Sequence, residues 1–345
     1  MHIIRLNNIF VEKNQPTNSC KMKKVLGMGN ALVDVLVQLQ SDDLLTELNF
    51  PKGSMQLVDE TRLNVIKEKI KGKETSVMAG GAAANTIAGL ARLGNSCGFI
   101  GKTGCDELAG VFFDDMTACG IKPLLLRNNM PSGRAVAFIS PDSERTFGTF
   151  LGAAAELNAS DLNPNMFSGY DYFFIEGYLV QNHELIERAI ILAKEAGCEI
   201  ALDLAGYNVV EANLDFFRYL IKEYTHIVFA NEEESKALTG KNPDQALLEI
   251  ADMCDIAVVK LGANGAFIKQ KDIFRHVAAI PASPVDTTGA GDLYAAGFIH
   301  GLSIDQPLHI CGEYGSIVAG NIVEVIGPKM SNERWDKIFD EIKKI

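Results

Sequence analysis

The stretch Asp286-Thr287-Thr288-Gly289-Ala290-Gly291-Asp292 decides the interpretation of this chain. The apolar run 293–300 that follows it predicts a buried helix, which would begin at the glycine turn. Gly289, Ala290 and Gly291 would then present backbone N–H groups at the helix N-terminus, where the helix dipole favours an anion. Asp292 would repel a resting phosphate, but it could accept a proton from a hydroxyl that attacks one. The stretch therefore predicts phosphoryl transfer to an alcohol, with Asp292 as the catalytic base.

A shorter string of this kind has a simpler explanation, because Asp292 could cap a helix and glycines often form turns. The whole string, however, resembles without a mismatch the C-terminal signature of the ribokinase/PfkB family of carbohydrate and nucleoside kinases. A second string at 80–94, Gly-Gly-Ala-Ala-Ala-Asn-Thr-Ile-Ala-Gly-Leu-Ala-Arg-Leu-Gly, resembles the N-terminal signature of the same family. Asn85 alone would also fit an ordinary helix start. Two signatures in the family's order make coincidence a poor explanation.

The resemblance implies an acceptor site made of Asp34, Gly80, Gly81 and Asn85. The segment 27–34 resembles the family segment whose carboxylate, here Asp34, holds the sugar hydroxyls of the acceptor. A carboxylate can accept two hydroxyl donors at once, which suits a diol. The small residues at 80–84 would let the acceptor approach the backbone, and Asn85 is a polar group on the first turn of an apolar helix.

The resemblance also implies that the chain uses ATP and Mg²⁺. Asn231-Glu232-Glu233-Glu234 matches the family's Asn-x-x-Glu pattern, in which Asn231 and Glu234 would organise Mg²⁺ through bound water. Taken without the family, the same string is an acidic first turn of a helix. Asp286 and Thr288 would lie near the monovalent-cation site of many members, which binds K⁺. The residues implied in ATP binding are Asn231, Lys260, Gly262, Gly265, Thr288, Gly289, Gly291 and Asn321, the last from the segment 321–327 that resembles the adenine-pocket stretch.

Residues 145–157 most resemble the adenosine-kinase-like branch. Here Phe147 or Phe150 would stack on a base, and Arg145 would approach the transferred phosphoryl group. Packing within a lid explains both aromatic residues equally simply. We therefore expect an ATP-dependent kinase for the hydroxymethyl group of a nucleoside or sugar, of adenosine-kinase type. The alternatives are a sugar kinase of ribokinase, fructokinase or 2-keto-3-deoxygluconate kinase type, and a catalytically silent ligand-binding relative.

The expected mechanism is direct in-line transfer without a phosphoenzyme. Asp292 would remove the hydroxyl proton while the amides of 289–291 stabilise charge on the moving phosphoryl group. Because a helix N-terminus lowers the pKa of a carboxylate, we expect Asp292 to be a weak base. A weak base suffices when the proton leaves late in a loose transition state.

Short apolar strands alternate with helical stretches along the chain, which is the pattern of a mostly parallel sheet covered on both faces. The resemblance, which covers 23–345, implies a ribokinase-like three-layer α/β sandwich with a small β-sheet lid. Strand 31–40 and a hairpin of 133–139 and 144–147 break the alternation and could form this lid. We expect one kinase domain over 22–345, with lid segments near 31–57 and 122–150. The expected strands of the main sheet are 24–29, 96–101, 170–175, 199–204, 226–230 and 256–261, and the expected helices are 83–93, 106–119, 182–196, 232–238, 244–253, most of 307–325, and 332–343.

Composition agrees with a cytoplasmic enzyme that acts on a small molecule. The chain has 345 residues, of which 47% are hydrophobic, and a net charge of −12 that argues against nucleic acid or an anionic membrane as partner. Its seven cysteines are scattered without a Cys-x-x-Cys pair, which favours reduced thiols. No apolar run approaches the roughly 20 residues needed to span a bilayer. A monomer or a homodimer is compatible with these features.

Residues 1–21 contain several Asn and Lys residues and lack the apolar stretch of a signal peptide. Met22 stands directly before the first predicted strand. We therefore expect 1–21 to be a disordered extension that follows from a misassigned start codon. The intact mass of the native protein would show whether its terminus is Met1 or a later residue.

Overall fold

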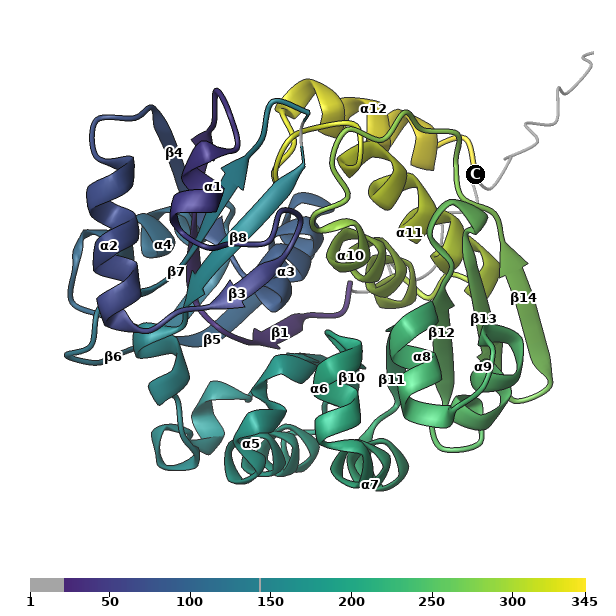
Figure 1. Ribbon diagram of the computed structural model, residues 1–345. Helices are drawn as coiled ribbons and strands as arrows, with labels where there is room; N and C mark the ends of the chain where they lie inside the picture. Colours follow the sequence, from purple (N-terminus) through teal and green to yellow (C-terminus); the bar gives the residue numbers. More distant parts are fainter. Residues whose placement is uncertain (1–21, 143) are drawn as a thin grey trace, which may run out of the picture.

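The computed structural model describes residues 22–142 and 144–345, so the expected extension at 1–21 lies outside the described residues. Within the described ranges, nine strands form one sheet in the order β14-β13-β12-β11-β10-β9-β1-β5-β6 (Figure 1). Neighbours pair in parallel from β6 to β12, and β13 and β14 add an antiparallel hairpin at one edge. The strands are β1 (Val25–Met28), β5 (Cys97–Thr103), β6 (Lys122–Arg127), β9 (Tyr172–Glu176), β10 (Glu199–Asp203), β11 (Ile227–Asn231), β12 (Ile256–Lys260), β13 (Ala266–Gln270) and β14 (Ile273–Val277).

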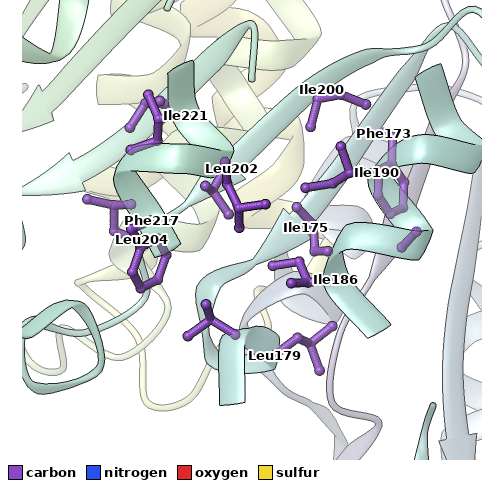
Figure 2. Packing of buried hydrophobic residues seen from close by; sticks show 14 of the residues in the cluster. Phe173, Ile175, Leu179, Ile186, Ile190, Ile200, Leu202, Leu204, Phe217 and Ile221 are labelled. Atoms are coloured by element: carbon purple, nitrogen blue, oxygen red, sulfur yellow. The ribbon is translucent and has the colours of Figure 1, made fainter. Parts of the chain in front are cut away.

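Helices cover both faces of this sheet because its strands alternate apolar side chains between two buried cores. Figure 2 shows one core, where Phe173, Ile175, Ile200 and Leu202 of the sheet meet Ile186 and Ile190 of α5 and Phe217 and Ile221 of α7. The helices on this face are α5 (His183–Glu195), α6 (Tyr207–Ala212), α7 (Leu214–Tyr224), α8 (Glu232–Thr239) and α9 (Pro243–Ala251). The other face carries α3 (Ala82–Arg92), α4 (Glu107–Ala118), α10 (Ala290–Ser303) and α11 (Leu308–Ile322), with α12 (Asn332–Ile342) packed on α11. The expected three-layer α/β architecture is confirmed.

A second sheet of five strands stands to one side of the large sheet (Figure 1). Its order is β3-β8-β7-β2-β4, made of β2 (Leu32–Gln38), β3 (Met55–Leu57), β4 (Thr75–Gly80), β7 (Gly133–Ile139) and β8 (Arg145–Phe150). One face packs against α1 (Asp43–Glu47) and α2 (Glu60–Ile70) around Val35, Val37, Leu63 and Ile66. We call this five-stranded sheet, with α1 and α2, the lid.

Two boundaries of the expected lid differ from the structure. The range 122–150 begins too early, because β6 pairs in parallel with β5 in the large sheet. This placement follows from α4, which connects β5 to β6 as a crossover helix between parallel strands. The lid also includes β4, which pairs antiparallel with β2 across a long separation in sequence. No helix in the described part of the chain is long and apolar enough to cross a membrane.

Candidate active site

A cleft of about 1010 Å³ lies between the lid and the carboxyl ends of the parallel strands. Four neighbouring strands, β9 to β12, each contribute their last residue to its wall, namely Glu176, Asp203, Asn231 and Lys260. Ligands of open α/β sheets bind at this edge, because the carboxyl ends of parallel strands meet there. The cleft is therefore the natural place for the chemistry that the sequence predicts.

The two signature strings meet in this cleft. Gly289 adopts a left-handed conformation with φ 76° and leads into α10, which begins at Ala290. Asp292 lies in the first turn of α10, and its Oδ2 accepts a hydrogen bond of 3.0 Å from Nδ2 of Asn85 in the first turn of α3. Gly291 and Asp292 line the cleft, whereas Gly289 and Ala290 shape the turn behind them. The expected pairing of an amide-rich turn with a carboxylate is thus present in space.

The pKa of Asp292 differs from the expectation. Burial raises it from 3.8 to about 7, and the carboxylates of Asp203 and Glu176 act in the same direction. The hydrogen bond from Asn85 and the ammonium of Lys260 act to lower it, but they do not outweigh burial. The helix N-terminus, which we expected to lower this pKa, does not outweigh burial either. Asp292 is therefore a stronger base than we inferred from the sequence.

Lys260, the last residue of β12, brings a cationic side chain to the cleft wall. Its Nζ lies 2.8 Å from Oδ2 of Asp203, and both side chains are largely buried. Burial acts to lower the pKa of Lys260, but the carboxylates of Asp203 and Glu234 outweigh it and the pKa is raised. The ammonium also lies next to Gly291, where a Cβ would approach Nζ to 3.1 Å. Lys260 is therefore positively charged and adjacent to the amide turn, as an anion would require.

Asn231 and Glu234 form a reciprocal cap at the start of α8. The Glu234 backbone N donates to Asn231 Oδ1 at 2.8 Å, while the Asn231 backbone N and Nδ2 donate to the Glu234 carboxylate at 2.8 and 2.7 Å. Burial raises the pKa of Glu234 to about 7. Both residues line the cleft, so their oxygens fit an indirect, water-mediated contact with Mg²⁺. No cluster of three or more His, Cys, Asp or Glu residues in the described ranges is arranged to hold a metal ion directly.

The lid contributes Asp34 from the face of β2 that points into the cleft. Burial raises the pKa of Asp34 to about 7, against the lowering effect of Arg145 and Lys329. Gly80 leaves room for this carboxylate, because a Cβ there would collide with it. Gly81 lines the cleft directly and has φ 99°. Of the four predicted acceptor residues, Asp34, Gly81 and Asn85 therefore line the cleft, and Gly80 lies behind Asp34.

Alternation along β8 separates Phe147 and Thr149 from Phe150. Phe147 and Thr149 line the cleft. Phe150 lies on the opposite face, in the core with α2, and cannot contact a ligand there. Arg145 does not line the cleft; its Nη2 is 2.8 Å from Oδ2 of Asp286, in a buried ion pair behind the turn. The expected approach of Arg145 to the phosphoryl group is not found, because Asp286 holds its guanidinium.

Four residues expected at the nucleotide have different surroundings. Thr288 and Gly262 line the cleft. Asn321 does not, because its fully buried amide donates to Ile317 O and to the Glu341 carboxylate between α11 and α12. Gly265 has φ 87° and no room for a side chain, so it shapes the turn between β12 and β13.

Glu176 is a site residue that the sequence interpretation missed. Its Oε1 accepts from the backbone N and Nδ2 of Asn30 at 2.9 and 2.7 Å, and its Oε2 accepts from the backbone N of Ala83 at 2.8 Å. Burial raises the pKa of this carboxyl. It therefore joins the connection between β1 and β2, which leads to Asp34, to the start of α3, which carries Asn85. The available signal was a charged residue at the end of an apolar strand.

Comparisons with known proteins agree with the fold of this chain. Residues 54–335 match the family model described as pfkB family carbohydrate kinase. A probable sugar kinase from Rhizobium etli has a solved structure that is 31% identical, with a TM-score of 0.84 over 93% of this chain and 98% of that one. The adenosine kinase from Sinorhizobium meliloti is also 31% identical, with a TM-score of 0.83 over 93% of this chain and 99% of that one. The adenosine kinase of Saccharomyces cerevisiae is 24% identical over 335 residues, which are 89% of this chain and 96% of that protein.

Proposed function

The chain belongs to the pfkB family of carbohydrate kinases, and on that basis we propose that it transfers the γ-phosphoryl group of ATP to the hydroxymethyl group of a nucleoside. As a nucleoside or sugar kinase, it is a phosphotransferase with an alcohol group as acceptor. The observation that carries the proposed mechanism is the contact between Asn85 and Asp292 beside the amide turn. It brings an acceptor residue, a base and an anion site to one point of the cleft.

Each group in the cleft has a role in this mechanism. Asp34, Gly81 and Asn85 hold the acceptor so that its hydroxyl faces Asp292. Asp292 accepts the hydroxyl proton as the new P–O bond forms, and its raised pKa makes it a competent base near neutral pH. The amides of the 289–291 turn stabilise the charge on the phosphoryl group, together with the Lys260 ammonium.

The nucleotide and metal would occupy the side of the cleft between Thr288 and Asn231. Asn231 and Glu234 would hold Mg²⁺ through water, which would neutralise charge on the phosphates. Their oxygens fit this role because they already form a fixed cap, to which no lysine or arginine of the described residues is hydrogen-bonded.

We favour a nucleoside over a free sugar because of the apolar wall of the cleft. Phe147 of the lid lines the cleft together with Leu151 and Leu157, which follow β8, and with Tyr178 and Leu179, which follow β9. Apolar and aromatic walls suit a base, whereas a free sugar offers few surfaces for them. The names of the similar proteins leave both acceptors in play, since one solved relative at 31% identity is a probable sugar kinase and another is an adenosine kinase.

ADP release from Mg-ATP tests the acceptor directly. The panel consists of adenosine, inosine, ribose, fructose and 2-keto-3-deoxygluconate, each measured with the wild type and with Asp292→Asn. Turnover of adenosine but not of ribose supports the nucleoside proposal. Turnover of sugars alone would replace it with the sugar-kinase alternative, and turnover of none would favour the silent relative.

We also propose a cytoplasmic protein that is a monomer or a homodimer. Six cysteines of the described ranges are free thiols, which suits a reducing compartment. The lid edge strand β3 exposes Met55 and Leu57, so a second copy could pair along it. Light scattering of the purified protein distinguishes the two states.

A further inference from the structure

The ion pair between Arg145 and Asp286 lies directly behind the amide turn. Arg145 is the first residue of the lid strand β8, and Asp286 lies in the loop that leads to α10. The nearest nitrogen and oxygen, Nη2 and Oδ2, are 2.8 Å apart, and the two side chains are only 7% and 6% exposed. Because a guanidinium stays charged even when it is buried, one at this depth is costly unless a carboxylate such as Asp286 balances its charge.

Both oxygens of the Asp286 carboxylate already have partners. Its Oδ1 accepts from the backbone N of Thr288 at 3.0 Å. Its Oδ2 accepts from the backbone N of Gly327 at 2.7 Å, in addition to the contact with Arg145. The Thr288 hydroxyl faces the same guanidinium, with Nη1 of Arg145 3.5 Å from Oγ1.

These contacts conflict with the K⁺ site that the family resemblance suggested at Asp286 and Thr288. A dehydrated K⁺ needs several oxygen ligands to replace its water shell. Here the Asp286 carboxylate and the Thr288 hydroxyl, which were expected to bind K⁺, both face the guanidinium of Arg145. Its positive charge would repel a second cation at contact distance. The two residues therefore do not fit a monovalent cation.

We propose that the guanidinium of Arg145 takes the place of a bound monovalent cation beside Asp286, so that this protein needs no K⁺ there. The chain itself then supplies the charge that balances Asp286. Because Asp286 also fixes the amides of Thr288 and Gly327, the guanidinium supports the loop that precedes the catalytic turn. Arg145 is in this sense a positioning residue that joins the lid to the anion site.

The test compares K⁺, Na⁺ and choline chlorides at one ionic strength, with the unfolding midpoint and the turnover as readouts. An ion without a site is not linked to folding, so the wild-type midpoints in K⁺ and Na⁺ should agree within about 1 °C. Turnover should change by less than about twofold, because there is no coupling between K⁺ and the acceptor. A wild-type midpoint or turnover that rises saturably with K⁺ would overturn the proposal.

Variants identify the group responsible. Arg145→Met removes the charge and should have a lower midpoint that K⁺ raises selectively, whereas Arg145→Lys should stay insensitive to K⁺. Arg134→Met is the matched control, because Arg134 pairs with Asp106 at 3.4 Å elsewhere and reports the general salt effect. Equal salt responses of Arg145→Met and Arg134→Met would also contradict the proposal. If Arg145→Met does not fold, the K⁺ dependence of the midpoints of the wild type and of Arg145→Lys still tests the proposal.

The turnover readout rests on the proposed function, but the midpoint readout does not. A protein without kinase activity whose midpoint ignores K⁺ would refute the function and leave this inference intact. An active kinase that K⁺ stabilises would do the reverse.

Discussion

Asp292→Asn should stabilise the protein above neutral pH while it removes activity. The carboxyl group of Asp292 has a pKa of about 7 in the folded protein, against 3.8 for an unperturbed side chain. Between these two values the folded protein binds a proton that the unfolded chain has released. Stability therefore falls as the pH rises through this window, and it levels off above about pH 7.

The magnitude follows from the same two values. The shift of about three units corresponds to about 4 kcal/mol at a pH above 7, at about 1.4 kcal/mol per unit. This is an upper limit, because Asp292 borders the open cleft and water there stabilises its charge. From about pH 5 to about pH 8 the wild type should lose up to about 2.7 kcal/mol of stability from this group, and the variant should lose none of this contribution.

Urea denaturation at a series of pH values between about 5 and 8 measures this difference. Fluorescence of Trp335, the one tryptophan of the sequence, reports unfolding because the ring is buried in α12. Asp244→Asn is the control, since Asp244 is an exposed carboxylate in the first turn of α9. Wild type and Asp292→Asn with parallel pH dependences would refute the argument that burial raises this pKa.

The same substitution should lower kcat by roughly 10²- to 10⁴-fold with little loss of ATP affinity, because it removes the base and keeps the amide turn. The wild-type kcat/KM for the acceptor should rise with pH to about 7 and then level off, as Asp292 loses its proton. A kcat/KM that does not change across this pH range would show that Asp292 is not the catalytic base.

Three further substitutions probe the cleft. Lys260→Met leaves the Asp203 carboxylate without its partner at 2.8 Å, so it should cost about 2–4 kcal/mol of stability and reduce turnover by about 10²-fold or more, by urea denaturation and ADP release. Gly81→Ala introduces a Cβ that collides with a backbone carbonyl at φ 99°, and it should lower stability more than Gly120→Ala, where φ is 75° but the space is open. Phe147→Ala should raise KM for adenosine about tenfold by loss of a base contact and leave any ribose turnover unchanged. An equal rise in KM for adenosine and for ribose would show that Phe147 does not contact the adenine base.

Local patterns in the sequence were enough to predict most strands and helices of the central sandwich, but not the helices α6 and α7, the hairpin β13–β14, or the place of β6 in the large sheet. The main-sheet strands near Lys24, Ser96, Tyr170, Glu199 and the two that follow all exist, because each is a short apolar run between helical stretches. The helix α7 was missed, although its buried residues Phe217, Leu220 and Ile221 have helical spacing. The hairpin β13–β14 was missed for a physical reason: four of the five residues of β14 are exposed, so this edge strand has no apolar alternation.

The site divides in the same way between local and long-range information. The meeting of Asn85 with Asp292 could be inferred because each string is a local helix start of a recognisable kind. The raised pKa of Asp292 could not, because it arises from burial and from carboxylates contributed by β9 and β10. The partner of Arg145 was equally hidden, since alternation along β8 indicates the face of a side chain but not which loop lies against it.

Phosphorus NMR of the product formed from adenosine and Mg-ATP tests the central claim most directly, because the proton coupling of the ester signal identifies the phosphorylated carbon. The account predicts one monoester on the hydroxymethyl carbon with the wild type. With Asp292→Asn, the yield in the same time should be lower by about 10²-fold or more. ADP formed without an ester, an ester on a ring hydroxyl, or an undiminished yield with Asp292→Asn would contradict it.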